Sequence, residues 1–372
     1  MINIIGIYDG FDHNYDEETF DKNGLGGSES WVVSISEALS KIPNTHIIVY
    51  CKCNYHIHRY YKNIEYMPHK YFLLNNMKYD ALLISRRLPQ DVINKIQQSN
   101  SCNNIYLIAH DINLVYLNED DNYELYYNRI LDNEFLLKNI KKIFTLSNWH
   151  KQFLHEEYGY PLELINVTCY GINVDLLNIN CNTERDNSIF WSNCIWRHFG
   201  ILVKNIAPRI LNKFPDFKIR FSHYENLNEG FAKDETYLLD YEYVTNLGNL
   251  KKIDLYNEMT QHKCAFYPCI FRETFCNTCI EQALCENQIV MPLRYGPGTI
   301  FEPYKYMFLN EKNYFINEDD YDIAANKIIN VLNTYYDEDK IAFRKSIKHY
   351  LISKYNWNNI AFDLFNKMNL HL

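Results

Sequence analysis

Short apolar runs alternate along the chain with longer stretches that favour helix. In the first half, six such runs predict buried strands, at residues 2–8, 46–51, 81–84, 105–109, 143–146 and 165–170. Helices are predicted between them, for example over 28–39 and 148–158. Strands that alternate with helices in this way are typical of parallel sheets with helical crossovers.

A polar stretch at 178–187, NINCNTERDN, offers almost nothing to bury and is the best candidate for a linker. The alternation then restarts. Further strands are predicted at 188–192, 217–222, 243–247, 264–267 and 289–292. Further helices are predicted over 201–213, 252–262, 278–286, 321–336, 339–354 and 356–368. Two such series predict an α/β chain of two Rossmann-like, doubly wound domains that face a central cleft, where ligands bind. The predicted boundaries are 1–180, 181–354 and a closing helix in 355–372.

Composition and charge exclude several classes of function. The net charge of −9 over 372 residues argues against nucleic-acid binding, which needs clustered Lys and Arg. No run approaches the ~20 apolar residues of a membrane span. The opening residues, MINIIGIYDG, do not have the form of a signal peptide, and eleven cysteines are scattered without a disulfide pattern. These features predict a cytoplasmic protein with reduced thiols.

A glycine-rich segment, Gly24-Leu25-Gly26-Gly27-Ser28-Glu29, stands between the first strand and the first long helix. Adjacent glycines let the backbone approach a ligand closely, and the helix start that follows offers free amides to an anion. The alternative is a tight turn in which Ser28 caps the helix. A P-loop is excluded because no Gly-Lys-Ser or Gly-Lys-Thr follows.

Two acidic residues, Glu273 and Glu281, stand eight positions apart across a predicted strand-to-helix junction. Both could face one ligand at the helix N-terminus. The alternatives are structural: Thr278-x-x-Glu281 fits a capping box, and Glu273 could be a solvated loop acid.

Other clusters carry weaker signals. Cys51, Cys53, His56 and His58 have a pattern compatible with metal binding, but chance clustering is the favoured explanation in a chain rich in these residues. Packing is favoured over redox or zinc chemistry for the Cys276-x-x-Cys279 pair. The aromatic side chains of Trp191, Trp196 and Tyr267 are predicted to lie in the core.

The spacing from Glu273 to Glu281 resembles the E-x7-E signature of retaining, nucleotide-sugar-dependent glycosyltransferases of family 4. The surrounding YPCIFRETFCNTCIEQALCENQIVMP is similar to that family's strand–loop–helix–strand segment, and GLGGSESWVVSISEALS resembles its N-terminal glycine loop and helix. Four further segments resemble family motifs in the right order along the chain: FTLSNWHKQFL, YGINVD, NLGNLKKIDLYNEM and KYNWNNIAFDLF.

The resemblance implies a GT-B fold and transfer of a sugar, with retention, from a nucleoside diphosphate such as UDP or GDP to a glycan or other hydroxyl acceptor. It implies an acceptor-binding first domain, a nucleotide-sugar-binding second domain, and a closing helix that crosses back to the first domain. No metal or other cofactor is implied. The resemblance implies no particular oligomeric state.

The resemblance also implies roles for individual residues. Glu273 matches the acid that contacts the donor sugar, and Glu281 the acid that binds the ribose. His110 matches a histidine near the sugar, and Arg197 one member of a basic pair for the diphosphate. The remaining implied donor contacts are Gly26 and Gly27 beside the phosphates, and the backbone of Thr274, Phe275, Cys276 and Asn277 around the sugar hydroxyls.

The sequence departs from the family pattern at a few positions. Cys276 and the pair Glu286-Asn287 stand where the family usually has glycine, and Ser192 or Asn193 occupies the position of its first arginine. Two other functions therefore stay open: a nucleotide-sugar epimerase or hydrolase of the same fold, and a degenerate binding module without catalysis.

Overall fold

The computed structural model describes residues 2–10, 15, 25–53, 59–61, 63–86, 88–99, 102, 104–112, 115–117, 128–129, 138–173, 177–179, 181, 184–223 and 226–370. The chain divides into two compact units. The first holds the described residues up to Gly171 and those from Tyr355 onward. The second runs from Ile172 to Lys354, so the chain leaves the first unit and returns to it at its end.

The first unit is built on an eight-stranded sheet with the order β11-β10-β7-β5-β1-β2-β4-β3. Its strands are β1 (Asn3–Asp9), β2 (Thr45–Cys51), β3 (Arg59–Tyr61), β4 (Ile64–Pro68), β5 (Ala81–Ser85), β7 (Ile105–Ile108), β10 (Ile140–Thr145) and β11 (Ile165–Val167). All pair in parallel except β3, which is antiparallel to β4. From β1 the strand order proceeds in both directions, so β1 and β5 flank the topological switch point of a doubly wound sheet.

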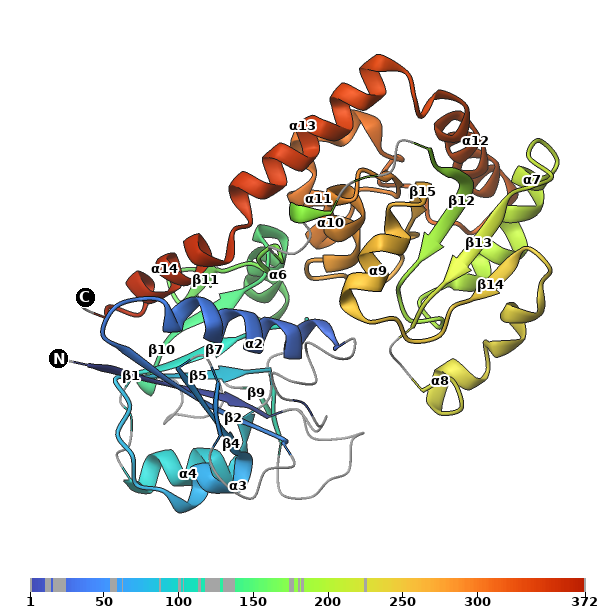
Figure 1. Ribbon diagram of the computed structural model, residues 1–372. Helices are drawn as coiled ribbons and strands as arrows, with labels where there is room; N and C mark the ends of the chain where they lie inside the picture. The colour runs from blue at the N-terminus through green and yellow to red at the C-terminus, as the bar shows by residue number, and fades with distance from the viewer. Residues whose placement is uncertain are drawn as a thin grey trace. The chain divides into compact units, whose positions relative to one another are not determined.

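Helices cover both faces of this sheet. They are α2 (Gly27–Ser40), α3 (His69–Leu74), α4 (Gln90–Ser99), α6 (Asn148–Tyr158) and α14 (Trp357–Lys367). Figure 1 shows α2 on one side of the sheet and α3 and α4 on the other. A small sheet of β6 (Leu88–Pro89), β8 (Val115–Leu117) and β9 (Asn128–Arg129) belongs to the same unit.

The closing helix α14 packs on α2 within the first unit. A side chain on Gly171 would collide with the indole of Trp357, which starts α14. The Tyr106 hydroxyl donates to the Met368 carbonyl at 2.7 Å, and Trp31 Nε1 of α2 donates to the carbonyl of Cys169 at 3.1 Å. The last helix therefore completes the first unit's own structure.

The second unit is built on a five-stranded parallel sheet with the order β14-β13-β12-β15-β16. Its strands are β12 (Asp186–Trp191), β13 (Lys218–Phe221), β14 (Val244–Asn246), β15 (His262–Phe266) and β16 (Gln288–Val290). The order again proceeds in both directions from its first strand, so β12 and β15 flank a second switch point. The apolar runs of the sequence are these buried strands.

The helical elements of the second unit follow the strands in turn. They are η3 (Ile201–Ile206), α7 (Ala207–Leu211), α8 (Gly230–Lys233), η4 (Thr236–Asp240), α9 (Lys252–Met259), α10 (Asn277–Leu284), α11 (Tyr295–Ile300), η5 (Glu302–Met307), α12 (Glu318–Thr334) and α13 (Glu338–Lys354). The helix predicted over 201–213 is split into a π-helical stretch, η3, and α7. Pro208 explains the split, because it has no N–H for an ordinary helical hydrogen bond.

Each unit has its own apolar core. Ile48, Leu82 and Leu107 are among the core residues of the first, and Ile189, Phe221 and Val290 are among those of the second. The predicted fold class, α/β with two Rossmann-like parallel sheets, is confirmed. Within the described part of the chain, none of the helices has the length and apolar character needed to cross a membrane.

Candidate functional site

Two loops at the switch point of the second unit carry half of the predicted site residues. One follows β12 and contains Arg197; the other follows β15, spans residues 267–276 and contains Glu273. Ligands of doubly wound sheets bind outside the carboxyl ends of the strands, at the point where the order reverses. The topology therefore places Glu273 and Arg197 at the expected ligand position of this unit.

Glu273 is held by two side chains from different parts of the unit. Its Oε2 accepts a hydrogen bond from Arg197 Nη1 at 3.1 Å and another from the Tyr267 hydroxyl at 2.9 Å. The carboxylate side chain keeps 12% of its surface exposed and the guanidinium side chain 27%. The alternative of a freely solvated loop acid is wrong, because Glu273 belongs to a fixed, charge-assisted network.

Aromatic rings fix Arg197 in turn. Its guanidinium carbon lies 4.8 Å from the ring centroid of Phe271 and 5.4 Å from that of Trp196. Trp196 is 43% exposed, so the prediction of a core position for this residue is wrong, whereas Trp191 and Tyr267 are buried as expected. Burial, with the Glu273 charge next, holds the pKa of Tyr267 well above its usual range, so this phenol stays a hydrogen-bond donor.

The end of the 267–276 loop has an unusual backbone. Cys276 has φ of 81° and directly precedes α10, in the left-handed region that favours glycine. This conformation explains why the family that the sequence resembles has glycine there. The Thr274, Phe275 and Cys276 side chains are buried, so these residues present their backbone rather than their side chains.

Gly296 supports this loop, and sequence analysis did not identify it; its place in RYGPG was the available signal. Its N–H donates to the Glu273 carbonyl at 2.9 Å. A Cβ at this position would lie 2.2 Å from the carbonyl oxygen of Thr274. Only glycine permits so close an approach, so α11 and the loop are locked together through this contact.

Glu281 has partners of its own, on α9. Its Oε1 accepts from Lys252 Nζ at 2.6 Å and from the Tyr256 hydroxyl at 2.9 Å. The predicted capping box is wrong: α10 begins at Asn277 after Cys276, so Thr278 does not occupy the cap position. The left-handed turn at Cys276 moves the helix start back by two residues.

In the first unit, three polar residues meet at the carboxyl ends of β1, β5 and β7. Asp9 ends β1, lies opposite Ser85 in the β1–β5 register, and is fully buried. His110 follows β7; its Nε2 lies 3.2 Å from the Ser85 hydroxyl and its Nδ1 3.0 Å from the Tyr170 hydroxyl. Burial lowers the pKa of His110 to about 3, so the imidazole is neutral at pH 7.

Asp9 is a residue that the sequence-based prediction missed. Its Oδ2 accepts from the Tyr15 hydroxyl at 2.6 Å, while Oδ1 has no hydrogen-bond partner within the part of the chain described above. Burial raises the pKa of Asp9 to about 7, and the Glu29 charge adds to this, against the lowering effect of the Tyr15 hydrogen bond. The only sequence signal was one acid after an apolar run.

The glycine-rich segment forms the start of α2. Gly26 is the cap residue and Gly27 the first helical residue, so the alternative with Ser28 as the cap is wrong. Glu29 is buried, and its Oε2 would lie 2.5 Å from a Cβ at Gly26. Its carboxylate therefore lies over the helix start, where one of the two interpretations of the sequence expected an anionic ligand.

Arg86 is a cation of this region, and sequence reasoning did not identify it. It adopts φ of 67°, and its guanidinium donates to the Ser28 hydroxyl at 3.0 Å and to Asp111 at 2.6 Å. A strained non-glycine residue at a sheet's carboxyl edge is typical of a functional position.

The cysteine clusters give no metal centre in the described part of the chain. There, no group of three or more His, Cys, Asp or Glu side chains could hold an ion. His56 and His58 of the weak metal pattern lie outside the described residues. Cys276 and Cys279 are buried, with their sulfur atoms 3.1 Å apart.

Comparison with known proteins identifies the architecture. No family model matches the chain, and no curated protein matches its sequence. Its fold resembles that of a glycosyltransferase from Rickettsia africae, with a TM-score of 0.68 and 16% identity over 99% of this chain and 98% of that one. It also resembles the sucrose-phosphate synthase of Thermosynechococcus elongatus, at 0.70 and 12% over 98% of both chains. Anabaena HepE in complex with UDP and glucose is similar at 0.65 and 12% over 100% of both chains.

These similarities define the class of fold. The chain has two Rossmann-like units, each with a switch point, and it covers its neighbours over nearly their whole length. This architecture is the GT-B fold of glycosyltransferases.

Proposed function

We propose that the chain is a glycosyltransferase that moves a sugar from a nucleoside diphosphate donor, such as a UDP- or GDP-sugar, to a glycan or other hydroxyl acceptor with retention. The observation that carries this proposal is the network of Glu273, Arg197 and Tyr267 at the second unit's switch point. HepE, whose structure holds UDP and glucose, supports a UDP-sugar as the first donor to test.

Departure of the leaving group builds negative charge on a diphosphate. Arg197 is a fixed cation at the expected ligand position, and the free amides at the start of α10 add a positive partial charge. Loss of one such contact typically costs about 2–4 kcal/mol in the transition state. Glu273 positions Arg197 and is proposed to contact the donor sugar, and no metal is required in this scheme.

Glu281 is proposed to hold the nucleotide ribose. Lys252, 2.6 Å from its Oε1, supplies a second cation close to the donor half of the molecule. The family that the sequence resembles has an arginine shortly after the strand equivalent to β12, and this chain lacks it. We propose that the positive charge of Lys252 replaces the charge of that arginine.

The first unit is proposed to bind the acceptor. A neutral His110, a carboxyl group on Asp9 that titrates near pH 7 and the strained Arg86 gather at its switch point. Such a set of donors and acceptors suits hydroxyl recognition. Gly26 and Gly27 are proposed to lie beside the donor phosphates.

Titration calorimetry with UDP, GDP and their hexose conjugates tests donor binding, in the wild type and in Arg197→Gln. We expect binding of one nucleotide series and at least ~10-fold weaker binding in the variant. NMR of the product formed with a panel of glycan acceptors then gives the anomeric configuration. An epimerised donor, or free sugar in the presence of acceptor, would identify an epimerase or hydrolase; binding without any turnover would identify a binding module.

A further inference from the structure

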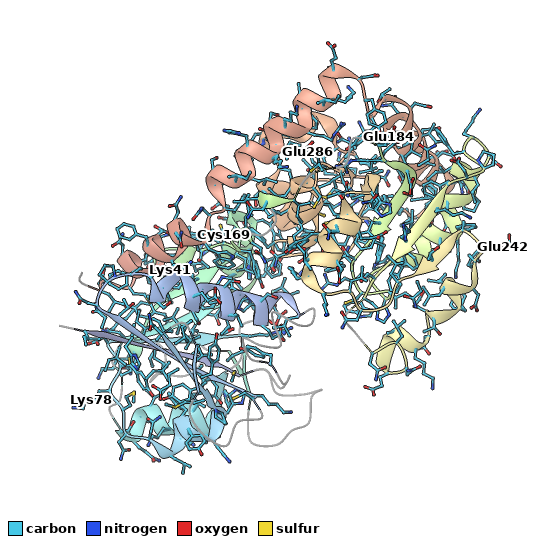
Figure 2. The ribbon with its side chains drawn as sticks, viewed as in Figure 1. Lys41, Lys78, Cys169, Glu184, Glu242 and Glu286 are labelled. Atoms are coloured by element: carbon cyan, nitrogen blue, oxygen red, sulfur yellow. The ribbon has the colours of Figure 1, made fainter. Side chains whose placement is uncertain are left out.

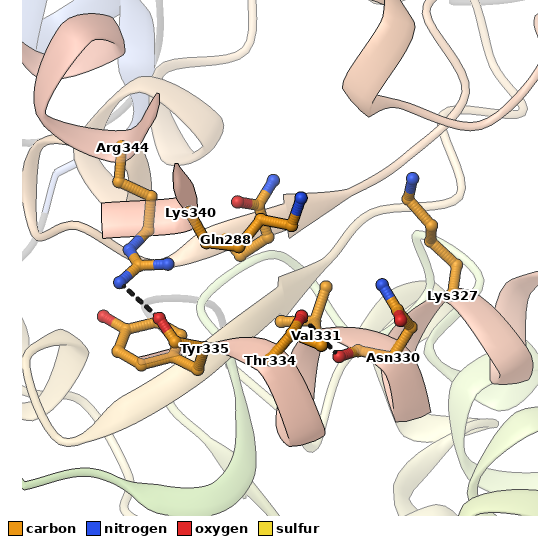
Figure 3. Close-up of a pocket in the computed structure, with 8 residues that line it drawn as sticks. All are labelled: Gln288, Lys327, Asn330, Val331, Thr334, Tyr335, Lys340 and Arg344. Atoms are coloured by element: carbon orange, nitrogen blue, oxygen red, sulfur yellow. Dashed lines mark hydrogen bonds between the residues drawn. The ribbon is translucent and has the colours of Figure 1, made fainter. Parts of the chain in front are cut away.

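A polar cavity lies in the second unit, away from the residues discussed so far. It has a volume of about 70 Å³ and is lined by α12, α13 and the start of β16 (Figure 3). Gln288 begins β16, whereas Glu273 follows the end of β15, so the cavity and the Glu273 network belong to opposite ends of one parallel sheet. A space of this size holds several water molecules or one small ion.

The cavity is lined by cations. Its charged lining residues are Lys327, Lys340 and Arg344, and no carboxylate is among its described lining residues. Figure 3 shows Lys340 and Gln288 close to Arg344, with Lys327 at the other end of the group. The ammonium of Lys340 lies 2.7 Å from Asp339, whose side chain is 70% exposed and therefore screens it only weakly.

Arg344 is the central observation. It is 5% exposed, and its Nη2 donates to the Tyr335 carbonyl at 2.7 Å while the guanidinium stacks 3.6 Å from the Tyr335 ring centroid. Its Nε and Nη1 have no hydrogen-bond partner among the described residues. Burying a guanidinium with two unsatisfied nitrogen atoms is costly, and a ligand in the cavity would remove that cost.

The nearby acid Glu286 acts on Arg344 favourably, but it is shared with another cation. Glu286, labelled in Figure 2, accepts from Lys348 Nζ at 3.0 Å. Arg185 is a further cation whose charge acts on Arg344. Among the charged residues named here, the cations around the cavity therefore outnumber the acids.

The uncharged residue Gln288 indicates which kind of anion would bind in this cavity. The Oε1 atom of Gln288 is buried and also lacks a partner among the described residues, so it can accept a hydrogen bond from a hydroxyl. A ligand that satisfies both Arg344 and Gln288 carries anionic oxygens and an O–H group. We propose that this cavity is a binding site for a phosphate monoester anion, either inorganic hydrogen phosphate or the phosphate of a sugar phosphate. None of the proposed donor-site residues lines it, so this site is separate from the proposed site of the nucleotide sugar.

Thermal unfolding of the full chain tests this site, with inorganic phosphate, a hexose 6-phosphate and the free hexose added at constant ionic strength. We expect at least one phosphate-bearing ligand at ten times its dissociation constant to raise the second unit's transition by roughly 3 °C, and the free hexose to have no effect. The better of the two phosphate ligands identifies the source.

Matched variants locate the effect. Lys340→Gln and Arg344→Gln should each weaken phosphate binding at least ~5-fold, since each removes a cation from the cavity. Lys305→Gln, which removes an exposed lysine of the same unit that pairs with Glu302, should leave it unchanged. If Arg344→Gln unfolds the unit, the phosphate affinity of Lys340→Gln alone tests the proposal. Arg197→Gln should also retain the shift. The proposal is overturned if neither phosphate ligand stabilises the wild type, if Lys340→Gln binds as the wild type does, or if only Arg197→Gln abolishes the shift.

Discussion

At the scale of single residues, the structure holds opposite charges in fixed positions. Glu273 and Arg197 are 76 residues apart in the sequence and 3.1 Å apart in the fold. No pattern in the sequence links them, because the pairing is created by β12 and β15 lying side by side. The resemblance to a family named both residues, but their mutual contact and the role of Tyr267 come from tertiary structure.

Glu273→Gln tests the proposed role of the carboxylate in turnover. The amide can still accept from Arg197 and Tyr267, so folding should be preserved, while the charge that acts on the transition state is lost. We expect the rate of nucleoside diphosphate release to fall at least ~100-fold with little change in the unfolding midpoint. Glu302→Gln removes a 61% exposed acid of the same unit and is the control. Equal rates in the two variants would remove Glu273 from the mechanism.

Asp9→Asn tests the buried carboxyl group through the pH dependence of stability. The pKa of Asp9 is about 7 in the folded chain and near 3.8 in the unfolded chain, so the folded state binds more protons between these values. The contribution of Asp9 is therefore fully present below pH 4 and is lost as the pH rises through 7. His110 and His150, whose pKa values burial lowers to about 3 and 4, act in the opposite direction, but both proteins contain them.

The measured quantity is thus the difference in unfolding free energy of the first unit, variant minus wild type. From pH 5 to pH 8 we expect this difference to shift by roughly 2 kcal/mol in favour of Asp9→Asn. Urea denaturation of both proteins at pH 5 and pH 8 measures this difference in unfolding free energy. A difference that stays constant across this range would show that Asp9 is ionised throughout.

At the scale of elements, hydrophobic pattern was a good guide where strands are buried on both faces. The strands predicted at 81–84 and 105–109 are Ala81–Ser85 and Ile105–Ile108, because such strands are continuously apolar. The strand Ile64–Pro68 was missed, because its sequence IEYMP holds a buried Glu65 that breaks the apolar run. The start of α10 was misplaced because Cys276 takes a conformation that sequence reasoning reserves for glycine.

Gly296→Ala tests the contact between α11 and the 267–276 loop. The new Cβ would lie 2.2 Å from the Thr274 carbonyl oxygen, which is backbone and can move only with the loop. We expect a loss of about 1–3 kcal/mol in the second unit's stability and at least tenfold weaker donor binding, since small misplacements of a binding loop are costly. Calorimetry with the donor nucleotide measures the second effect.

Gly298→Ala is the matched control for this prediction. It lies in the same helix, so the gain in helix propensity from alanine is common to both variants. Its Cβ would lie 3.3 Å from the Leu293 backbone, a much milder contact. If the two variants lose equal affinity, the specific contact between Gly296 and the loop is not what shapes the site.

At the scale of the whole molecule, the chain uses its last residues to complete its first unit. Ile360, Leu364 and Phe365 of α14 are buried there, and Lys367 Nζ donates to the Val167 carbonyl at 3.0 Å. Fully burying each of these side chains contributes about 1.5–3 kcal/mol. Their sum approaches the whole stability of a typical domain, which is about 5–15 kcal/mol.

A chain that stops after Lys354 should therefore unfold its first unit while the second keeps its structure, because every residue removed belongs to the first. Hydrogen exchange resolved by peptide would show lost protection in β1 and β5 and unchanged protection in β12 and β15. Phe365→Ala should weaken the same unit by about 3–5 kcal/mol, whereas Phe362→Ala, 48% exposed on the same helix, should change its stability by less than about 0.5 kcal/mol. Full protection of β1 in the shortened chain would mean that the first unit folds without α14, and the buried face of that helix would then contribute little to its stability.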